Sequence, residues 1–339
     1  MDRSVLLAGL LLASLVPVGC APRRPAALEG PSSAGRVLVL AHRGASAARP
    51  EHSLAAYELA HAQGADLIEP DLVCSRDGVL VCLHDLTLER VTDVAQRFPG
   101  RARADGRWYA ADLDWSELEV LRCAAGGDGS EGREGHGLVR LDDMLALVTR
   151  LNQESGRTVG VVPEPKRPAW HAAQGLDLIG PTRRALLAWS ERNPGAPVVV
   201  QCFEREALGA LADPRAEDAS AGGGHRAGRD GEPGGCWPLV WNLSSPLPGP
   251  DELGTLCAGL DGIGLPRSAF EGDGAPGPAL LERARALGLM VVVWTFRGDE
   301  EGLARFLGRF PVDGVFADDP DVAIRARGRA AAARRPGRR

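Results

Sequence analysis

The feature of this sequence that most constrains its fold is a series of eight short apolar segments separated by helix-like stretches. Several of the segments are rich in valine and carry no polar interruption, which is typical of parallel strands buried on both faces. Strand–helix alternation repeated eight times predicts an α/β protein, a TIM (β/α)₈ barrel. The predicted strands span residues 37–41, 66–72, 158–163, 197–202, 239–243, 262–265, 289–295 and 312–316.

Amphipathic stretches between these strands supply the predicted helices. A chain of 339 residues falls within the usual size of a single barrel. We therefore expect one catalytic barrel domain over residues 36–325. The clearest predicted helices span residues 53–63, 175–192, 205–212, 279–287 and 300–310.

Three segments depart from the plain barrel pattern. An extra strand at 79–83 is followed by a stretch without strong periodicity, so we predict a long capping insertion at about 85–140, after the second strand and over the active-site end. Residues 215–235 are dominated by Gly, Ala, Asp and Arg, and predict a flexible surface insertion. The basic tail 326–339 is expected to be disordered.

The amino terminus resembles an export signal. Arg3 precedes an apolar run at 5–18 that is short for a membrane span, and Cys20 stands where a lipoprotein signal places its lipidated cysteine. Residues 1–20 are thus a predicted signal peptide and 21–35 a linker. We expect an exported bacterial protein, either periplasmic or anchored to the membrane through Cys20, with ordinary cleavage as the alternative.

Charge and cysteine content exclude two classes of protein. The net charge of −6 gives no basic surface for nucleic acid, so nucleic acid is not an expected partner. The seven cysteines show no CxxC spacing, which argues against thiolate-bound zinc. Without Cys20 the remaining six could form up to three disulfides, but we expect most of them to be small buried apolar residues.

Reactive side chains collect at the ends of the predicted strands. Catalytic groups of a TIM barrel lie at the carboxyl ends of its strands, so these side chains are expected to share one site. Two pairs, Glu69 with Asp71 and Glu164 with Lys166, are spaced i and i+2 and therefore face the same way. The strand-end residues are His42, Arg43, Glu69, Asp71, His84, Glu164, Lys166, Gln201 and Trp294.

The three carboxylates predict a metal site. Glu69, Asp71 and Glu164 would repel one another at the top of a barrel unless a cation neutralised them. Oxygen ligands without a soft partner select a hard divalent ion, Ca²⁺ or Mg²⁺. His42 and His84 beside that ion would supply a general acid and a general base near neutral pH.

Lysine usage indicates phosphate chemistry. Lys166 is the only lysine among 39 basic residues. Coding bias toward arginine explains the other 38 but not this exception, because a compact ammonium and a planar guanidinium fork meet a phosphate oxygen differently. We therefore expect Arg43 and Lys166 to stabilise charge on phosphoryl oxygens.

Motifs along most of the chain resemble the glycerophosphodiester phosphodiesterase family. The main signature is H-R-G at 42–44, P-E-H-S at 50–53, G-A-D-L-I-E-P-D at 64–71 and D-G-V-L-V-C-L-H-D at 77–85. The likeness continues through L-E-R-V-T-D-V at 88–94, P-E-P-K at 163–166, Q-C-F at 201–203, V-W-T at 293–295 and D-G-V-F-A-D-D-P-D at 313–321. The segment 97–110 and the W-H at 170–171 are similar to the periplasmic, calcium-dependent branch.

This resemblance implies roles for individual residues. It implies Glu69, Asp71 and Glu164 as ligands of one divalent cation, Ca²⁺ before Mg²⁺, and His42 and His84 as the catalytic pair. It implies phosphate and substrate contacts for Arg43, Lys166, Glu51, Gln201 and Trp294. The implied reaction is metal-dependent hydrolysis of small glycerophosphodiesters, such as glycerophosphocholine, to sn-glycerol 3-phosphate and an alcohol.

Two alternatives stay open at the level of sequence. One is a lysophospholipase D or phosphatidylinositol-type phosphodiesterase on the same barrel, which would need an apolar mouth for an acyl chain. The other is a non-catalytic lipoprotein that binds through the same surface. The arginine-rich segment at 97–107 favours a small water-soluble diester over the acylated substrates.

Overall fold

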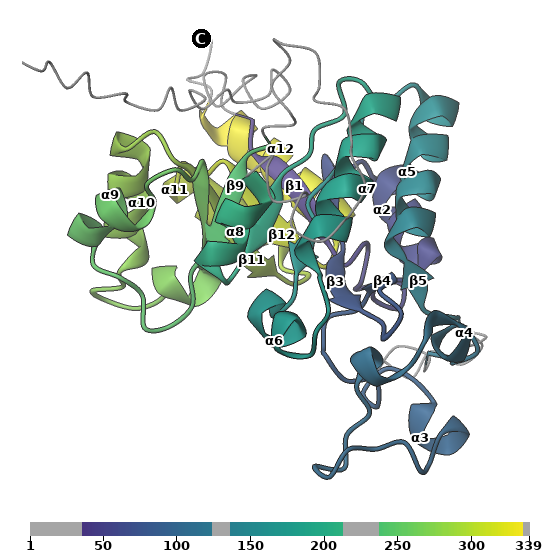
Figure 1. Ribbon diagram of the computed structural model, residues 1–339. Coiled ribbons are helices and arrows are strands. Elements are labelled where there is room, and N and C mark those ends of the chain that lie inside the picture. The colour runs from purple at the N-terminus through teal and green to yellow at the C-terminus, as the bar shows by residue number, and fades with distance from the viewer. Residues whose placement is uncertain (1–35, 124–135, 213–236, 335–339) are drawn as a thin grey trace, which may run out of the picture.

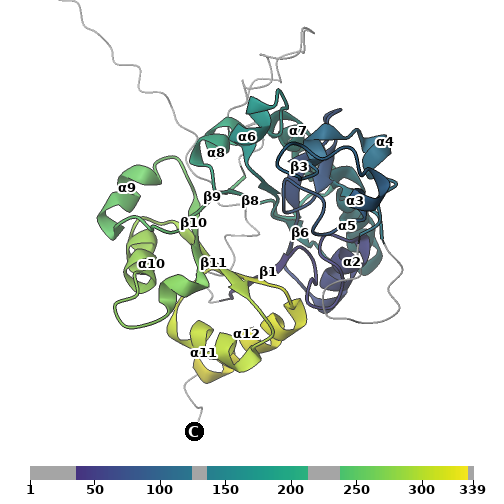
Figure 2. The same ribbon diagram turned by 90° about the horizontal axis from the view of Figure 1, so that it is seen from below.

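Eight parallel strands form the closed barrel that the sequence predicts (Figures 1 and 2). The computed structural model describes residues 36–123, 136–212 and 237–334. The sheet closes where Val161 N donates to Pro197 O at 3.0 Å and Val199 N donates to Val161 O at 3.1 Å. Its strands, in spatial order, are β6 (Gly160–Val161), β2 (Leu67–Glu69), β1 (Leu38–His42), β12 (Gly314–Ala317), β11 (Met290–Phe296), β10 (Gly262–Pro266), β9 (Leu239–Asn242) and β8 (Val200–Cys202).

A second, four-stranded sheet continues from the barrel on one side. The strand predicted at 66–72 divides at Pro70 and the strand predicted at 158–163 stops before Pro163, because proline cannot donate to a ladder. After each proline the backbone continues as a strand of the small sheet, β3 (Asp71–Cys74) after Pro70 and β7 (Glu164–Pro165) after Pro163. The strand order of this sheet is β5 (Val139–Arg140), β4 (Leu80–Cys82), β3 and β7.

Helices surround the barrel in Figure 2. The five predicted helices are confirmed within a few residues, whereas the prediction omits the long helices α5 and α12 and the short helices α3, α4, α6 and α9. Helix α2 begins after Ser53, whose hydroxyl accepts from Ala56 N, and ends at Gly64. The helices are α2 (Leu54–Gln63), α3 (Val94–Arg97), α4 (Trp115–Leu118), α5 (Leu141–Ser155), α6 (Pro168–Ala173), α7 (Ile179–Arg192), α8 (Arg205–Ala212), α9 (Leu253–Leu256), α10 (Gly277–Ala286), α11 (Glu300–Arg309) and α12 (Pro320–Arg334), with short 3-10 turns at Ala110–Asp112, Pro250–Glu252 and Arg267–Phe270.

The barrel interior is a packed core rather than a channel. Side chains from seven of the eight strands, or from residues next to them, fill it, and larger clusters pack between strands and helices. The interior cluster consists of Leu40, Leu67, Val162, Val199, Val240, Met290, Val292 and Phe316. The described cysteines, Cys74, Cys82, Cys123, Cys202 and Cys257, are buried and free, so the expectation of small apolar residues is confirmed for these five.

The prediction of a disordered tail from residue 326 is wrong for residues 326–334. These residues belong to α12, which packs against α11, β1 and β12. Ala326 is fully buried, and Arg327 ion-pairs with Asp66 near the start of β2. The buried residues of this helix are mainly alanines, which bury little apolar area, and arginines stand between them in the sequence. The sequence therefore lacks the pattern of large apolar residues that indicates a packed helix. Residues 335–339 lie outside the described residues.

The insertion after the second strand has its own small core. Leu88, Val94, Leu113 and Leu118 are buried in a cluster with residues of β3 and β4. In Figure 2 its helices α3 and α4 lie to one side of the barrel axis, and its residues Thr87, Arg107 and Tyr109 line a cavity together with Lys166. Irregular backbone with few periodic positions is here stabilised by this cluster and by arginine–carboxylate pairs such as Arg103–Asp112.

Some predictions fall on residues outside the described ranges. These are the signal peptide and linker at 1–35 and the flexible insertion at 215–235. Among the helices of the described residues, none is both long and apolar enough to cross a membrane.

Docking of α12 predicts opposite effects for two alanines of the same helix. Ala326→Glu would bury a charge and should lower the free energy of unfolding by on the order of 2 kcal/mol or more. Ala331→Glu adds the same charge on the exposed face and should change it by less than about 0.5 kcal/mol. Urea unfolding followed by circular dichroism measures both. Equal, negligible effects would show that residues 326–334 do not pack on the barrel.

Candidate functional site

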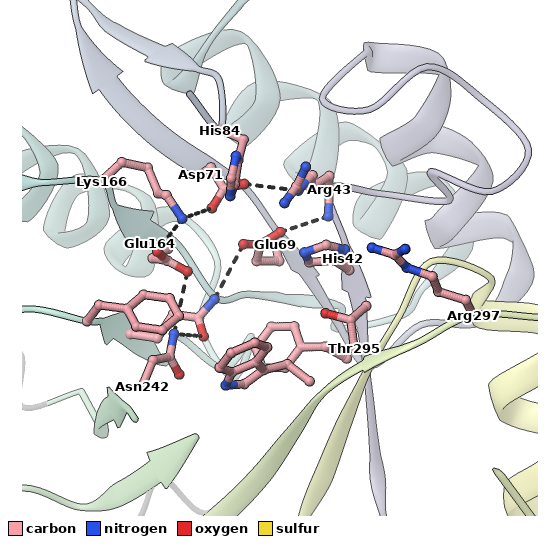
Figure 3. Close-up of a pocket in the computed structure, with 14 residues that line it drawn as sticks. His42, Arg43, Glu69, Asp71, His84, Glu164, Lys166, Asn242, Thr295 and Arg297 are labelled. Atoms are coloured by element: carbon pink, nitrogen blue, oxygen red, sulfur yellow. Dashed lines mark hydrogen bonds and ion pairs between the residues drawn. The ribbon is translucent and has the colours of Figure 1, made fainter. Parts of the chain in front are cut away.

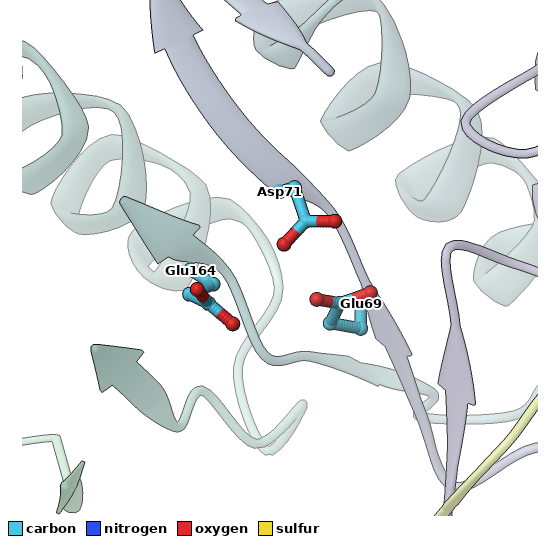
Figure 4. A group of neighbouring side chains, drawn as sticks. All are labelled: Glu69, Asp71 and Glu164. Atoms are coloured by element: carbon cyan, nitrogen blue, oxygen red, sulfur yellow. The ribbon is translucent and has the colours of Figure 1, made fainter. Parts of the chain in front are cut away.

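Three buried carboxylates meet at the carboxyl end of the barrel (Figures 3 and 4). Glu69, Asp71 and Glu164 each offer an oxygen within 4.8 Å of the others. Strand register places them there, because Asp71 is the direct partner of Glu164 in the β3–β7 ladder and Glu69 is the partner of His42 in the β1–β2 ladder. The prediction that these strand-end residues share one location is confirmed.

The charge of this cluster favours a bound cation. Burial, with repulsion from Asp71 and Glu164, raises the pKa of Glu69 well above its usual value. Burial also raises the pKa of Glu164 to about 7. Burial alone would raise the pKa of Asp71 too, but nearby cationic groups, Lys166 foremost, hold it well below its usual range. Oxygen donors in this state suit a hard divalent ion, and the three residues could hold one.

Lys166 contacts two of the three carboxylates. Its Nζ lies 2.6 Å from Glu164 Oε1 and 3.4 Å from Asp71 Oδ1. Burial disfavours the ammonium, but Asp71 and Glu164 outweigh it and raise the pKa of Lys166. The only lysine of the chain is therefore a fixed positive charge at the edge of the cluster.

Arg43 reaches the cluster from a strained turn after β1. Its φ of 57° is unusual for a residue with a side chain, and Gly44 follows at 83°. A Cβ on Gly44 would lie 2.7 Å from the Ala56 carbonyl carbon, so only glycine permits this close turn. The turn directs Arg43 N to Glu69 Oε2 at 2.7 Å and brings Arg43 Nε within 3.2 Å of Asp71 Oδ2.

Each of the two histidines is oriented by its own carboxylate. His42 Nδ1 lies 2.6 Å from Asp318 Oδ1, and His84 Nδ1 lies 2.6 Å from Asp85 Oδ1. An ionised carboxylate only accepts hydrogen bonds, so Nδ1 is the donor and Nε2 is left without the proton. Burial lowers the pKa of His84, which favours this neutral form. Both rings line the same cavity, of about 200 Å³.

Of the other three predicted residues, two line this cavity and the third, Glu51, contacts a residue that does. Gln201 and Trp294 line it, and Gln201 Nε2 donates to Glu69 Oε1 at 3.4 Å. Glu51 stands behind Arg43, whose Nη1 donates to Glu51 Oε2 at 3.0 Å. Arg43 and Arg90 hold the pKa of Glu51 down at about 2, against the effect of its burial. It is therefore an anion that positions arginine.

Sequence reasoning missed Asn242 and His52. Asn242 Nδ2 donates to Gln201 Oε1 at 2.9 Å, and its Oδ1 occupies space 2.0 Å from where a Cβ on Gly264 would lie. Asn242 ends β9, so its strand-end position was the available signal. His52 is buried in the P-E-H-S motif, where its Nε2 donates to Asp71 Oδ2 at 3.1 Å and its Nδ1 accepts from the Tyr57 hydroxyl at 2.9 Å.

Arg90 ties the insertion to both halves of the site. Its Nε lies 2.5 Å from Asp85 Oδ2, and its Nη2 lies 2.5 Å from Glu51 Oε1. Asp85 orients His84, and Glu51 holds Arg43. One guanidinium from the insertion thus connects the support of a histidine with the support of an arginine.

The carboxylate cluster predicts a stability effect that needs no assay of activity. Glu69→Gln should stabilise the ion-free protein at pH 7, because it removes a carboxylate whose raised pKa makes its ionised form unfavourable in the fold. The same variant should lose the stabilisation by Ca²⁺ or Mg²⁺, which for the parent protein reaches about 2.7 kcal/mol at a hundredfold excess over Kd. Thermal unfolding with and without the ion measures both effects.

Glu89→Gln is the matched control for this experiment. Glu89 pairs with Arg107 in the insertion and lies outside the carboxylate cluster, so its variant should keep the response to the ion. An unchanged response in Glu69→Gln would contradict the assignment of a cation to this cluster.

A family model and several known proteins match a large part of this chain. The model of the glycerophosphoryl diester phosphodiesterase family matches residues 42–215. A glycerophosphodiester phosphodiesterase of Haemophilus influenzae is 31% identical over 211 residues, covering 58% of this chain and 58% of the relative. One from Treponema pallidum is 32% identical over 214 residues, covering 59% of this chain and 56% of the relative. The chain thus spans a little over half the length of these curated relatives.

Solved structures share the barrel. An Oleispira antarctica phosphodiesterase, solved in complex with the product sn-glycerol-3-phosphate, has a TM-score of 0.59 at 22% identity, covering 87% of this chain and 98% of that one. A putative glycerophosphoryl diester phosphodiesterase from Silicibacter pomeroyi has a TM-score of 0.63 at 22% identity, covering 87% and 94%. These two likenesses establish the fold, and the match of the family model over residues 42–215 shows that the chain belongs to the glycerophosphoryl diester phosphodiesterase family.

Proposed function

We propose that this chain is a metal-dependent phosphodiesterase that hydrolyses glycerophosphodiesters to sn-glycerol 3-phosphate and an alcohol. The observation that carries the proposal is the arrangement of two carboxylate-oriented histidines and two fixed cations around three buried carboxylates. Membership of the family and the product complex of the Oleispira relative support the choice of substrate.

We infer that the cation is Ca²⁺, with Mg²⁺ as the alternative. Glu69, Asp71 and Glu164 would hold it. All three offer oxygen, and the flexible geometry of Ca²⁺ sites tolerates a cluster in which Lys166 also contacts two of the ligands. When bound, the ion would supply a positive charge that polarises the phosphodiester.

The histidines supply proton transfer. The unprotonated Nε2 of one ring accepts the proton of the attacking oxygen. The other ring, protonated at Nε2, donates to the oxygen of the leaving alcohol. If the attacking oxygen belongs to water, glycerol 3-phosphate forms directly; if it belongs to the glycerol 2-hydroxyl, a cyclic phosphate forms first and water then opens it with the roles of the two rings exchanged. Asp85 and Asp318 keep each ring in place and stabilise its protonated form.

Arg43 and Lys166 stabilise the negative charge that builds on the phosphoryl oxygens. Both are held by buried carboxylates before the substrate arrives, so little reorganisation is needed during the reaction. The polar groups at the mouth favour a small water-soluble diester over a lipid with an acyl chain, because an acyl chain would require an apolar surface there.

Single histidine substitutions test the proposed chemistry. His42→Ala and His84→Ala should each lower kcat for glycerophosphodiester hydrolysis by about 10²–10⁴-fold. His136→Ala, in the insertion and outside the cavity lining, should keep the rate of the parent protein. Release of glycerol 3-phosphate in the presence of Ca²⁺, and after EDTA, is the measurement. Full activity in both site variants, or in EDTA, would refute the proposal.

We also propose that the protein is exported and that Cys20 is its lipid-attachment residue. The apolar run at 5–18 and the small residues before Cys20 support this proposal. Expression of the full chain in a bacterium with labelled palmitate should label the parent protein and leave Cys20→Ser unlabelled. Recovery of both proteins in the cytoplasm at full length would contradict export, and an unlabelled but cleaved parent would contradict lipidation alone.

A further inference from the structure

We propose that a second cavity beside the carboxylate site binds the leaving alcohol, that it selects a hydroxyl-rich alcohol over a quaternary ammonium one, and that Arg167 determines this selection. The inference rests on the proposed phosphodiesterase function and specifies the part of the substrate that the family's name leaves open.

The position of the second cavity suits the departing group. It measures about 620 Å³, against about 200 Å³ for the cavity over the carboxylates. The two share His84, Glu164, Lys166 and Phe203 in their linings. A diester whose phosphate meets Lys166 and His84 therefore has one substituent over the carboxylates and room for the other in the larger space.

Hydrogen-bonding groups surround this larger space. Thr87 and Tyr109 come from the insertion, and Ser244 comes from the loop after β9. The Thr87 hydroxyl accepts from Arg107 Nη2 at 2.9 Å, and the Tyr109 hydroxyl donates to Asp105 Oδ2 at 2.8 Å, which leaves the second lone pair of the Tyr109 oxygen free to accept. Such a mixed set of donors and acceptors fits an alcohol with several hydroxyl groups.

The acidic groups of the lining already have partners. Asp85 pairs with Arg90 and His84, and Glu164 pairs with Lys166. Glu204 accepts from Ala169 N at 2.8 Å. Two of these three carboxylates are neutralised by cations, and a quaternary ammonium that approached Glu204 would also have to approach several fixed positive charges.

The aromatic rings of the lining are engaged by cations as well. The Lys166 ammonium lies 5.5 Å from the centre of the Phe203 ring, and the Arg103 guanidinium lies 4.1 Å from the centre of the Tyr109 ring. Tyr109 also stacks on Trp170 with ring centres 5.4 Å apart. The aromatic faces that recognise a quaternary ammonium in other proteins are thus already occupied in part by positive groups.

Arg167 is the cation of the lining that no carboxylate of the described residues holds. Among the described residues, its guanidinium has no hydrogen-bond or ion-pair partner, whereas Arg107 pairs with Glu89 and Lys166 with Glu164. Its backbone lies in the left-handed region at φ 50°, Pro168 begins α6 directly after it, and His171 N donates to its carbonyl oxygen at 3.1 Å. The planar fork of donors can bind two neighbouring hydroxyl oxygens together.

Two diesters that differ only in the alcohol test the inference. With the full chain and Ca²⁺, kcat/KM should be at least about tenfold higher for glycerophosphoinositol than for glycerophosphocholine, the gain expected from a hydrogen bond to a charged group. Arg167→Gln should reduce kcat/KM for glycerophosphoinositol by about tenfold and leave that for glycerophosphocholine within about twofold. Retained turnover of the choline diester also shows that the variant is folded.

Arg101→Gln is the matched control, since Arg101 is paired with Glu117 in the insertion and lines neither cavity. It should leave both substrates unaffected. Equal kcat/KM for the two diesters, preference for the choline diester, or an equal loss for both in Arg167→Gln would overturn the inference while leaving the phosphodiesterase function in place. Hydrolysis of neither diester by the parent protein would overturn that function and this inference together.

Discussion

Mutual repulsion among three buried carboxylates is the constraint around which the rest of the site is arranged. Glu69, Asp71 and Glu164 converge because strand register leaves them no other direction. Every neighbour that approaches them carries a positive charge or a hydrogen-bond donor, including backbone N–H of Arg43 and the amides of Gln201 and Asn242. These donors do not fully compensate the buried negative charge, since burial still raises the pKa of Glu69 and Glu164. A divalent ion would supply the positive charge that is missing.

The positions of these residues could be predicted because parallel strands share one carboxyl edge. Once the eight apolar segments were placed, His42, Glu69 and Glu164 had to lie at the same rim. The spacing of Glu69 and Asp71 was informative for the same reason, although Pro70 between them divides the strand into two sheets. That division follows from the chemistry of proline, but the partner strand that each half finds depends on contacts far away in the sequence.

Other features depend on tertiary contacts that the local sequence pattern does not indicate. The buried face of α12 is made of alanines, so its docking on β1 and β12 leaves a weak hydrophobic signal. In the sequence nothing distinguishes Asn242 from other polar residues. Its place in the site depends on Gly264 of the neighbouring strand, which leaves space for the Asn242 side chain. The lateral position of the insertion follows from its separate hydrophobic cluster, whose residues are scattered along the sequence between Val73 and Leu121.

The hydrogen bond from His42 to Asp318 joins residues 276 positions apart in the sequence, at the first and last strands of the barrel. The ring of this histidine is therefore oriented only after the final strand has docked. Because the chain is synthesised from its amino end, this strand is the last one that can join the barrel. A chain that is truncated, or clipped before its last strand, keeps its carboxylates and both histidines but leaves His42 without its partner. The orientation of the His42 ring thus depends on completion of the barrel.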